Sequence, residues 1–122
     1  MHIEHIKEHG IDLAVISSDE KLIVDTRSAL DLMMTVKYET GAARLVIDKR
    51  AVAEDFFILS TGIAGEILQK FINYQVKAAF YGDYSGYTSK PLRDFIYESN
   101  KGKDFFFVAT KEEAIRRLSE TA

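Results

Sequence analysis

Residues 44 to 72 read RLVIDKRAVAEDFFILSTGIAGEILQKFI, and they contain the patterns of a strand, a loop and a helix in that order. The apolar run Leu45–Ile47 ends at Asp48, which is typical of a buried strand. After the loop, Ser60-Thr61-Gly62 precedes a segment with apolar residues at helical spacing, namely Ile63, Ile67, Leu68, Phe71 and Ile72. A buried strand followed by an amphipathic helix is the unit from which parallel α/β sheets are built.

The alternation of strand and helix continues on both sides of this stretch. Two short β-rich runs at the start of the chain are joined by His9-Gly10, which favours a hairpin turn. The expected strands are Ile3–Glu8, Ile11–Ser17, Leu45–Asp48, Val76–Tyr81 and Phe105–Val108. We therefore expect one α/β domain over residues 1–122, with a mainly parallel five-stranded sheet and four flanking helices.

Residues that cap helices mark where the expected helices begin. The candidate capping residues are Asp25 or Ser28, Ser60 or Thr61, Thr88 or Ser89, and Thr110, in the order of the four helices. Gly41 follows the first helix, and the only proline, Pro91, lies in the first turn of the third helix. Two pairs four residues apart, Glu112–Arg116 and Glu113–Arg117, are expected to stabilise the fourth helix.

Composition and charge limit the class of protein. The 122 residues are 47% hydrophobic and carry a formal net charge of −3, with no basic run. This balance argues against nonspecific binding to nucleic acid or to an anionic membrane. The absence of cysteine excludes disulfides, thiolate catalysis and Cys-ligated zinc. Because no leader pattern and no membrane-spanning apolar stretch are found, we expect a cytoplasmic protein.

Ser60, Thr61, Gly62 and Gly65 form the first candidate site. Backbone N–H groups at a helix N-terminus lack partners, and the helix dipole favours negative charge there. Such a turn can bind an anion, or carry a phosphate on its own hydroxyls. The simpler interpretation is that Thr61 caps the helix by accepting from the N–H of Ala64, while the glycines allow close packing on the sheet. A regulatory role further requires that a hydroxyl be exposed.

Carboxylates follow three of the expected strands, at Asp19, Asp48 and Asp83. Strand ends of a parallel sheet lie on one edge, where Asp48 and Asp83 could hold Mg²⁺. The simpler interpretation is that each aspartate caps or turns the chain. We expect that Asp48 and Asp83 do not share an ion, and that Asp48 accepts from nearby backbone N–H groups.

The histidines and the other polar residues give no support for an enzyme. His2, His5 and His9 all lie in the first hairpin, without a cysteine or HExxH partner, and a solvated role is favoured over metal binding. The candidate hydroxyls have no histidine near them in the expected topology, so no nucleophile–base pair is expected. There is no phosphate-binding or dinucleotide-binding glycine motif either. We expect no cofactor.

Aromatic residues are expected to form a surface for a partner. Phe56 and Phe57 lie in the loop after one strand, and Tyr84 and Tyr87 lie in the loop after the next. Two adjacent phenylalanines in a loop are not expected to point inward together, and for one of the two, filling of the core is at least as strongly favoured as exposure. If the two loops are neighbours, the four side chains form an aromatic patch beside Thr61, and such residues are favoured in interface cores.

Two family resemblances are carried by these residues. The element order and the passage Leu59–Gly65 resemble the STAS domain, the family of the sporulation anti-sigma-factor antagonist. Its motif has an acidic residue, two hydroxyl residues, glycine, an aliphatic residue and glycine. Here Leu59 stands in place of the acidic residue, and one extra residue separates the glycines. The resemblance implies that Thr61 is the phosphorylated residue.

A second resemblance covers nearly the whole chain. Four segments are similar to the bacterial domain of unknown function numbered 4180, and they are Ser28–Met33, Glu54–Phe57, Gly65–Tyr74 and Tyr87–Glu98. This resemblance implies a STAS-like fold without a known activity.

Three functions are compatible with these patterns. The first hypothesis is a non-enzymatic regulatory module that binds a protein partner, or a second copy of itself, through the segment from Phe56 to Gly65, under control of a phosphate on Thr61 or Ser60. The first alternative is a small-molecule or anion sensor at the helix N-terminus after Thr61. The second alternative is a Mg²⁺-dependent enzyme of phosphate chemistry at Asp48 and Asp83.

Overall fold

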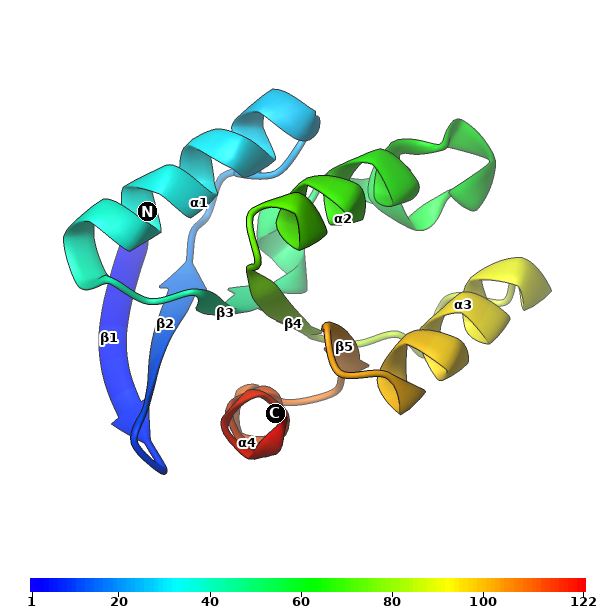
Figure 1. Ribbon diagram of the computed structural model, residues 1–122. Helices are drawn as coiled ribbons and strands as arrows, with labels where there is room; N and C mark the ends of the chain where they lie inside the picture. Colours follow the sequence, from blue (N-terminus) through cyan, green and yellow to red (C-terminus); the bar gives the residue numbers. More distant parts are fainter.

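The computed structural model describes Met1–Ala122 as one five-stranded sheet with helices on both of its faces (Figure 1). The strands are β1 His2–Glu8, β2 Ile11–Ser17, β3 Arg44–Asp48, β4 Lys77–Tyr81 and β5 Phe105–Val108. The helices are α1 Thr26–Thr40, α2 Ile63–Asn73, α3 Lys90–Lys101 and α4 Lys111–Glu120. The expected order of strands and helices is confirmed. No helix is sufficiently long and apolar to cross a membrane.

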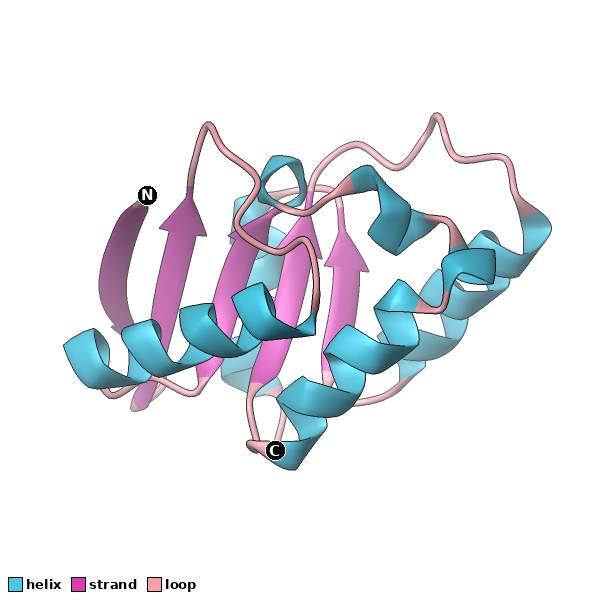
Figure 2. Ribbon diagram, turned by 90° about the horizontal axis from the view of Figure 1, so that it is seen from above, coloured by secondary structure: helices cyan, strands magenta, loops and turns pink.

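The strands lie in the order β1-β2-β3-β4-β5, so each strand pairs with its neighbour in sequence. The prediction that β2, β3, β4 and β5 run parallel in one sheet is confirmed, as Figure 2 shows. The sheet as a whole is mixed, because β1 pairs antiparallel with β2. A two-residue turn at His9-Gly10, with φ of 53° and 77°, joins these two strands and permits only the antiparallel arrangement.

Helices α1, α2 and α3 pack on one face of the sheet, and α4 packs alone on the other (Figure 1). The larger core lies on the first face and includes Phe71 and Phe80. The smaller core lies under α4 and includes Leu13, Phe106 and Leu118. Consequently the chain leaves β4 toward one face and leaves β5 toward the opposite face.

The long connection from β3 to α2 is more ordered than a plain loop. It contains three short 3₁₀ helices, Lys49–Ala51, Glu54–Phe57 and Leu59–Thr61. Ile23, in the segment between β2 and α1, is fully buried and forms a parallel bridge with Val52. The N–H of Ala53 donates to the carbonyl of Ile23 at 2.9 Å, so these two connections hold each other in place.

Three of the four helices begin at an expected capping residue. Asp25 caps α1, and Ser28 completes a reciprocal capping box with it. Ser89 caps α3 and Thr110 caps α4.

The expected ion pairs of α4 are wrong in detail. Arg116 does not pair with Glu112. Its guanidinium nitrogens lie 3.7 Å from a carboxylate oxygen of Glu113 and 3.6 Å from one of Glu120. Arg117 turns inward, where its guanidinium lies over the ring of Phe106 and donates to the carbonyl of Asn100. This contact fixes α4 on the sheet, which a surface pair with Glu113 would not do.

Candidate functional site

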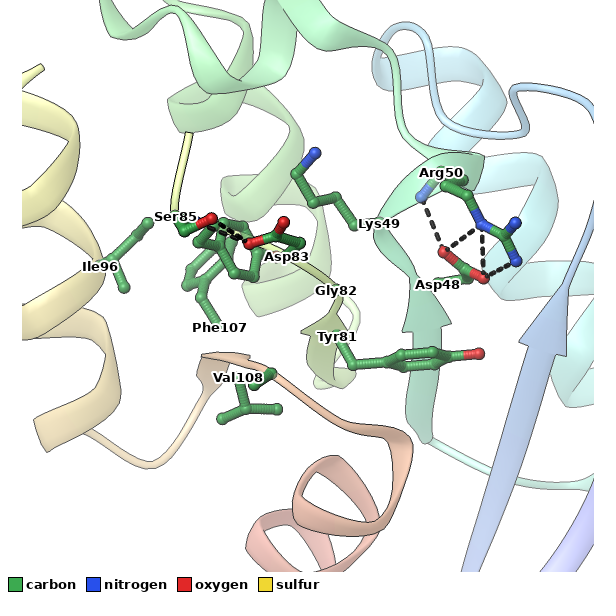
Figure 3. Close-up of a pocket in the computed structure, with 12 residues that line it drawn as sticks. Asp48, Lys49, Arg50, Tyr81, Gly82, Asp83, Ser85, Ile96, Phe107 and Val108 are labelled. Carbon is green, nitrogen blue, oxygen red and sulfur yellow. Dashed lines mark hydrogen bonds and ion pairs between the residues drawn. The ribbon is translucent and has the colours of Figure 1, made fainter. Parts of the chain in front are cut away.

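An open cavity of about 840 Å³ lies at the carboxyl ends of β3, β4 and β5 (Figure 3). The loops after β4 and β5 leave this edge toward opposite faces, and such a point is where open α/β sheets bind ligands. We call it the edge cavity. Its lining residues are Asp48, Lys49, Arg50, Tyr81, Gly82, Asp83, Tyr84, Ser85, Ile96, Phe107, Val108 and Ala109.

Asp48 and Arg50 form one end of the edge cavity. The buried carboxylate of Asp48 accepts from the backbone N–H of Arg50 at 2.9 Å, which confirms the expected bond to a neighbouring backbone group. It also accepts from Nε and Nη2 of the Arg50 side chain, at 3.1 Å and 2.8 Å (Figure 3). Burial opposes ionisation of Asp48, but the hydrogen bonds from Arg50 outweigh it and lower the pKa of this carboxyl.

Lys49 turns from the same strand end into an aromatic cage. Its ammonium nitrogen lies 5.4, 5.8 and 4.7 Å from the ring centroids of Phe57, Tyr84 and Tyr87. The Lys49 side chain is 15% exposed, and its nitrogen lies 3.8 Å from a carboxylate oxygen of Glu54. These distances are those of cation–π contacts, so the cage already holds a cation that belongs to the chain.

Asp83 and Ser85 lie on the opposite side of Gly82 from Asp48, as Figure 3 shows. One oxygen of Asp83, Oδ1, accepts from the backbone N–H of Ser85 at 2.9 Å and from its hydroxyl at 2.6 Å. These two bonds lower the pKa of Asp83. The neighbouring Tyr84 donates its hydroxyl to the carbonyl of Phe80 at 2.9 Å, and burial raises its pKa. The loop after β4 is therefore held by its own side chains.

Asp48 and Asp83, the expected residues of the magnesium alternative, line the same cavity but belong to separate hydrogen-bonded groups. No group of three or more histidine, aspartate or glutamate side chains is placed to hold a metal ion. Nε2 of His5 lies 2.9 Å from a carboxylate oxygen of Asp12 across the first hairpin, and all three histidines are exposed.

The structure places Thr61 one residue and Ser60 two residues before the N-cap of α2, so the expectation that either residue caps this helix is wrong. The N-cap of α2 is Gly62, whose φ of 77° favours glycine. The hydroxyl of Thr61 accepts from the N–H of Ile63 at 3.2 Å, so the predicted bond from Ala64 is wrong. As a donor, the same hydroxyl oxygen lies 2.8 Å from the carbonyl oxygen of Ile58 and 3.0 Å from that of Asp55. Both Ser60 and Thr61 are exposed.

The glycines of this turn have different roles from those expected. A Cβ at Gly65 would meet no atom within 4 Å, so close packing on the sheet does not require a glycine there. Gly62 is required by its backbone conformation instead.

The expectation that Phe56 and Phe57 cannot both point inward is wrong. Both side chains are buried, with 1% and 3% exposure, and their ring centroids are 5.0 Å apart. A 3₁₀ turn points both rings toward the core, where Phe56 lies near Phe80 and Phe57 near Tyr84. The four aromatic candidates are therefore brought together as expected, but mainly as a packed cluster. Tyr87 remains partly exposed and donates its hydroxyl to Glu54 at 3.0 Å.

Lys49, Glu54 and Ser85 are site residues that sequence reasoning missed. One signal was available for Lys49, because it directly follows a buried strand at the edge where ligands bind. Its aromatic partners lie up to 38 positions away along the chain, and no local pattern connects them.

The chain belongs to the family described as Domain of unknown function (DUF4180), which it matches over residues 8–118. No curated protein and no solved structure matches it.

Proposed function

We propose that this chain is a non-enzymatic regulatory module of STAS type that acts in the cytoplasm. A protein partner, or a second copy of the chain, would bind to the turn Ile58–Gly62, which precedes α2. The observation that carries the proposal is the exposure of both hydroxyls, Ser60 and Thr61, on a turn that is held by hydrogen bonds.

The surroundings of the turn support a docking role. Ile58 is a large apolar side chain that is 51% exposed, and it directly follows the packed Phe56 and Phe57 in the chain. A groove of about 400 Å³ runs between this turn and the start of α3, and Ser60, Tyr87 and Pro91 are among its lining residues. An exposed aliphatic side chain next to a groove with a tyrosine rim is a suitable anchor for a partner side chain.

Hydrogen bonding suggests how a phosphate would regulate such docking. Phosphate on Thr61 would remove the hydroxyl donor that holds the carbonyls of Ile58 and Asp55, and would therefore loosen the turn. Phosphate on Ser60, for which no hydrogen bond is present, would instead add charge to the groove close to Glu54. Both modifications would weaken an apolar contact centred on Ile58.

Site-specific photo-crosslinking tests the proposal. A benzoyl-phenylalanine at position 58 should capture a partner in cells that produce the protein, whereas the same residue at Tyr38 should not. Tyr38 is a matched control because it is 92% exposed but lies near the end of α1. The captured partner is then purified and titrated with the wild type, Thr61→Glu and Ser60→Glu. Equal capture from both positions, or unchanged affinity for both variants, would contradict the proposal.

The two alternative functions have less support. For the sensor at the helix N-terminus after Thr61, only Ser60 of the four candidate residues lines the groove, and Thr61, Gly62 and Gly65 line neither the groove nor the edge cavity. The magnesium alternative would need Asp48, whose carboxylate is already bound on one side by Arg50.

A further inference from the structure

The charged side chains of the edge cavity differ in how fully they are paired with other groups of the protein. Asp48 is bound by the Arg50 side chain through three contacts of 2.8 to 3.2 Å. Lys49 is engaged by Glu54 and by the aromatic cage. Asp83 uses only Oδ1, for its two bonds from Ser85, and its second oxygen, Oδ2, has no partner in the protein. Oδ2 of Asp83 is therefore the carboxylate oxygen in this part of the cavity that has no partner.

The aromatic cage explains why Asp83 remains available. Lys49 is the lining cation adjacent to Gly82, and its charge contributes to the lowered pKa of Asp83. However, no ion pair forms between them, because the ammonium of Lys49 is held among Phe57, Tyr84 and Tyr87 beside Glu54. The hydrogen bonds from Ser85 lower the pKa of Asp83 further below its ordinary value, so this carboxylate is ionised at neutral pH.

Apolar side chains make up the wall beside this carboxylate. Ile96 of α3 and Phe107 and Val108 of β5 line the cavity next to Asp83 and Ser85 (Figure 3). The wall belongs to a fixed part of the fold, because Phe107 packs against the rings of Phe80 and Phe95. Pockets that bind small molecules typically combine such apolar walls with a few polar groups that set orientation.

We propose that the edge cavity binds a small primary amine with an apolar body. The ammonium group donates to Oδ2 of Asp83, and the body lies against Ile96, Phe107 and Val108. A carboxylic acid on the same wall is disfavoured because it would meet the ionised Asp83. Lys49 is held by Glu54 and the aromatic cage, and Arg50 lies at the other end of the cavity beside Asp48. This inference concerns a different surface from the turn Ile58–Gly62, so either can fail without the other.

Three probes with the same aromatic body test the proposal, namely phenethylamine, phenethyl alcohol and hydrocinnamate. Each is titrated into the intact chain while backbone amide chemical shifts are followed. The amine should shift Gly82–Ser85 and Phe107–Ala109 in a saturable manner. The alcohol should bind about three- to fivefold more weakly, because an open ion pair contributes modestly, and the acid should not saturate.

Substitutions distinguish the contribution of the Asp83 carboxylate to binding from that of the apolar wall. Asp83→Asn should weaken the amine about three- to fivefold and leave the alcohol unchanged, whereas Asp94→Asn, a matched exposed aspartate on α3, should change neither. Ala109→Trp should weaken both probes, because a larger side chain at this exposed lining position fills the cavity. Tighter binding of the acid, unchanged amine affinity in Asp83→Asn, or shifts confined to other surfaces would overturn the proposal.

Discussion

The ammonium nitrogen of Lys49 lies 4.7 Å from the centre of the Tyr87 ring. Lys49 follows β3, and Tyr87 belongs to the loop between β4 and α3, so the contact joins two loops at the carboxyl edge of the sheet. Glu54 completes the connection, because it accepts from the Tyr87 hydroxyl at 3.0 Å and lies 3.8 Å from the Lys49 nitrogen. The proposed docking turn and the edge cavity are therefore on either side of one cation-centred cluster.

Removing the charge at the centre of this cluster should destabilise the protein. Lys49→Met retains most of the side-chain volume but loses the cation–π contacts and the ion pair. We expect the free energy of unfolding to fall by about 1–2 kcal/mol in urea denaturation. Lys101→Met is the matched control, since Lys101 lies 4.3 Å from the Tyr97 ring centroid but is 56% exposed. Lys101→Met should lower the free energy of unfolding by about 0.5 kcal/mol or less. An equal decrease for both variants would contradict the special role of Lys49.

Gly82 should not tolerate a side chain. A Cβ at this position would lie 2.8 Å from the Cβ of Lys49, and its φ of 155° is rarely adopted by other residues. We expect Gly82→Ala to lower the free energy of unfolding by about 1–3 kcal/mol. Gly86→Ala, in the same loop, should change it by about 0.5 kcal/mol or less, because a Cβ there meets no atom within 4 Å.

Asp48 should contribute to stability above pH 4 and lose this contribution in acid. Its folded pKa is below its unfolded value, since the hydrogen bonds from Arg50 outweigh the opposing effect of burial. The unfolded chain therefore takes up the proton first, and the contribution of Asp48 is lost as the pH falls from about 4 through the folded pKa. Denaturation curves recorded between about pH 6 and pH 2 should show a smaller loss of stability for Asp48→Asn than for the wild type. An identical pH dependence in both proteins would refute this assignment.

The two hydroxyls of the docking turn should differ in their effect on stability. Thr61→Ala loses the bonds to Ile58 and Ile63 and should cost on the order of 1 kcal/mol. Ser60→Ala removes a hydroxyl for which no hydrogen bond is present, so its free energy of unfolding should stay within about 0.5 kcal/mol of the wild type. A larger cost for Ser60→Ala would mean that the turn is held differently.

Asn100 should protect the outer edge of β5. Its side-chain amide accepts from the N–H of Phe107 at 2.7 Å and donates to the carbonyl of Phe107 at 3.0 Å. Asn100→Ala leaves both backbone groups of an edge strand without partners. It should therefore cost about 1–3 kcal/mol and increase aggregation, as measured by denaturation and light scattering.

Asn73→Ala is the control for this variant. Asn73 makes only an exposed side-chain bond to Gln69, so its loss should cost about 0.5 kcal/mol or less and leave the protein monodisperse to the same degree as the wild type.

Local patterns were sufficient to predict the strands and most helix starts. The apolar run Phe105–Val108 is a strand with the same bounds in the structure, and Thr110 caps the helix that follows. These features depend on interactions within a few residues, such as the bond from the N–H of Glu113 to the Thr110 hydroxyl. The cap of α2 was displaced to Gly62 because Leu59–Thr61 forms a separate 3₁₀ turn before the helix.

The candidate site could be predicted only in part. Asp48 and Tyr84 were identified from their positions after strands, and both line the edge cavity. The burial of Phe57 together with Phe56 was not foreseen, because the packing partners of Phe57, Tyr84 and Tyr87, come from another loop 27 and 30 residues further along the chain.

By itself, the sequence determined the order of strands and helices, the parallel arrangement of β2 to β5 and most of the caps, because periodic burial and capping bonds act over short distances along the chain. Only the tertiary structure decided that Lys49 is enclosed by aromatic rings and that a cavity opens between the loops after β4 and β5. The cage requires side chains from two separate loops, and the cavity exists because α3 and α4 pack on opposite faces of one sheet.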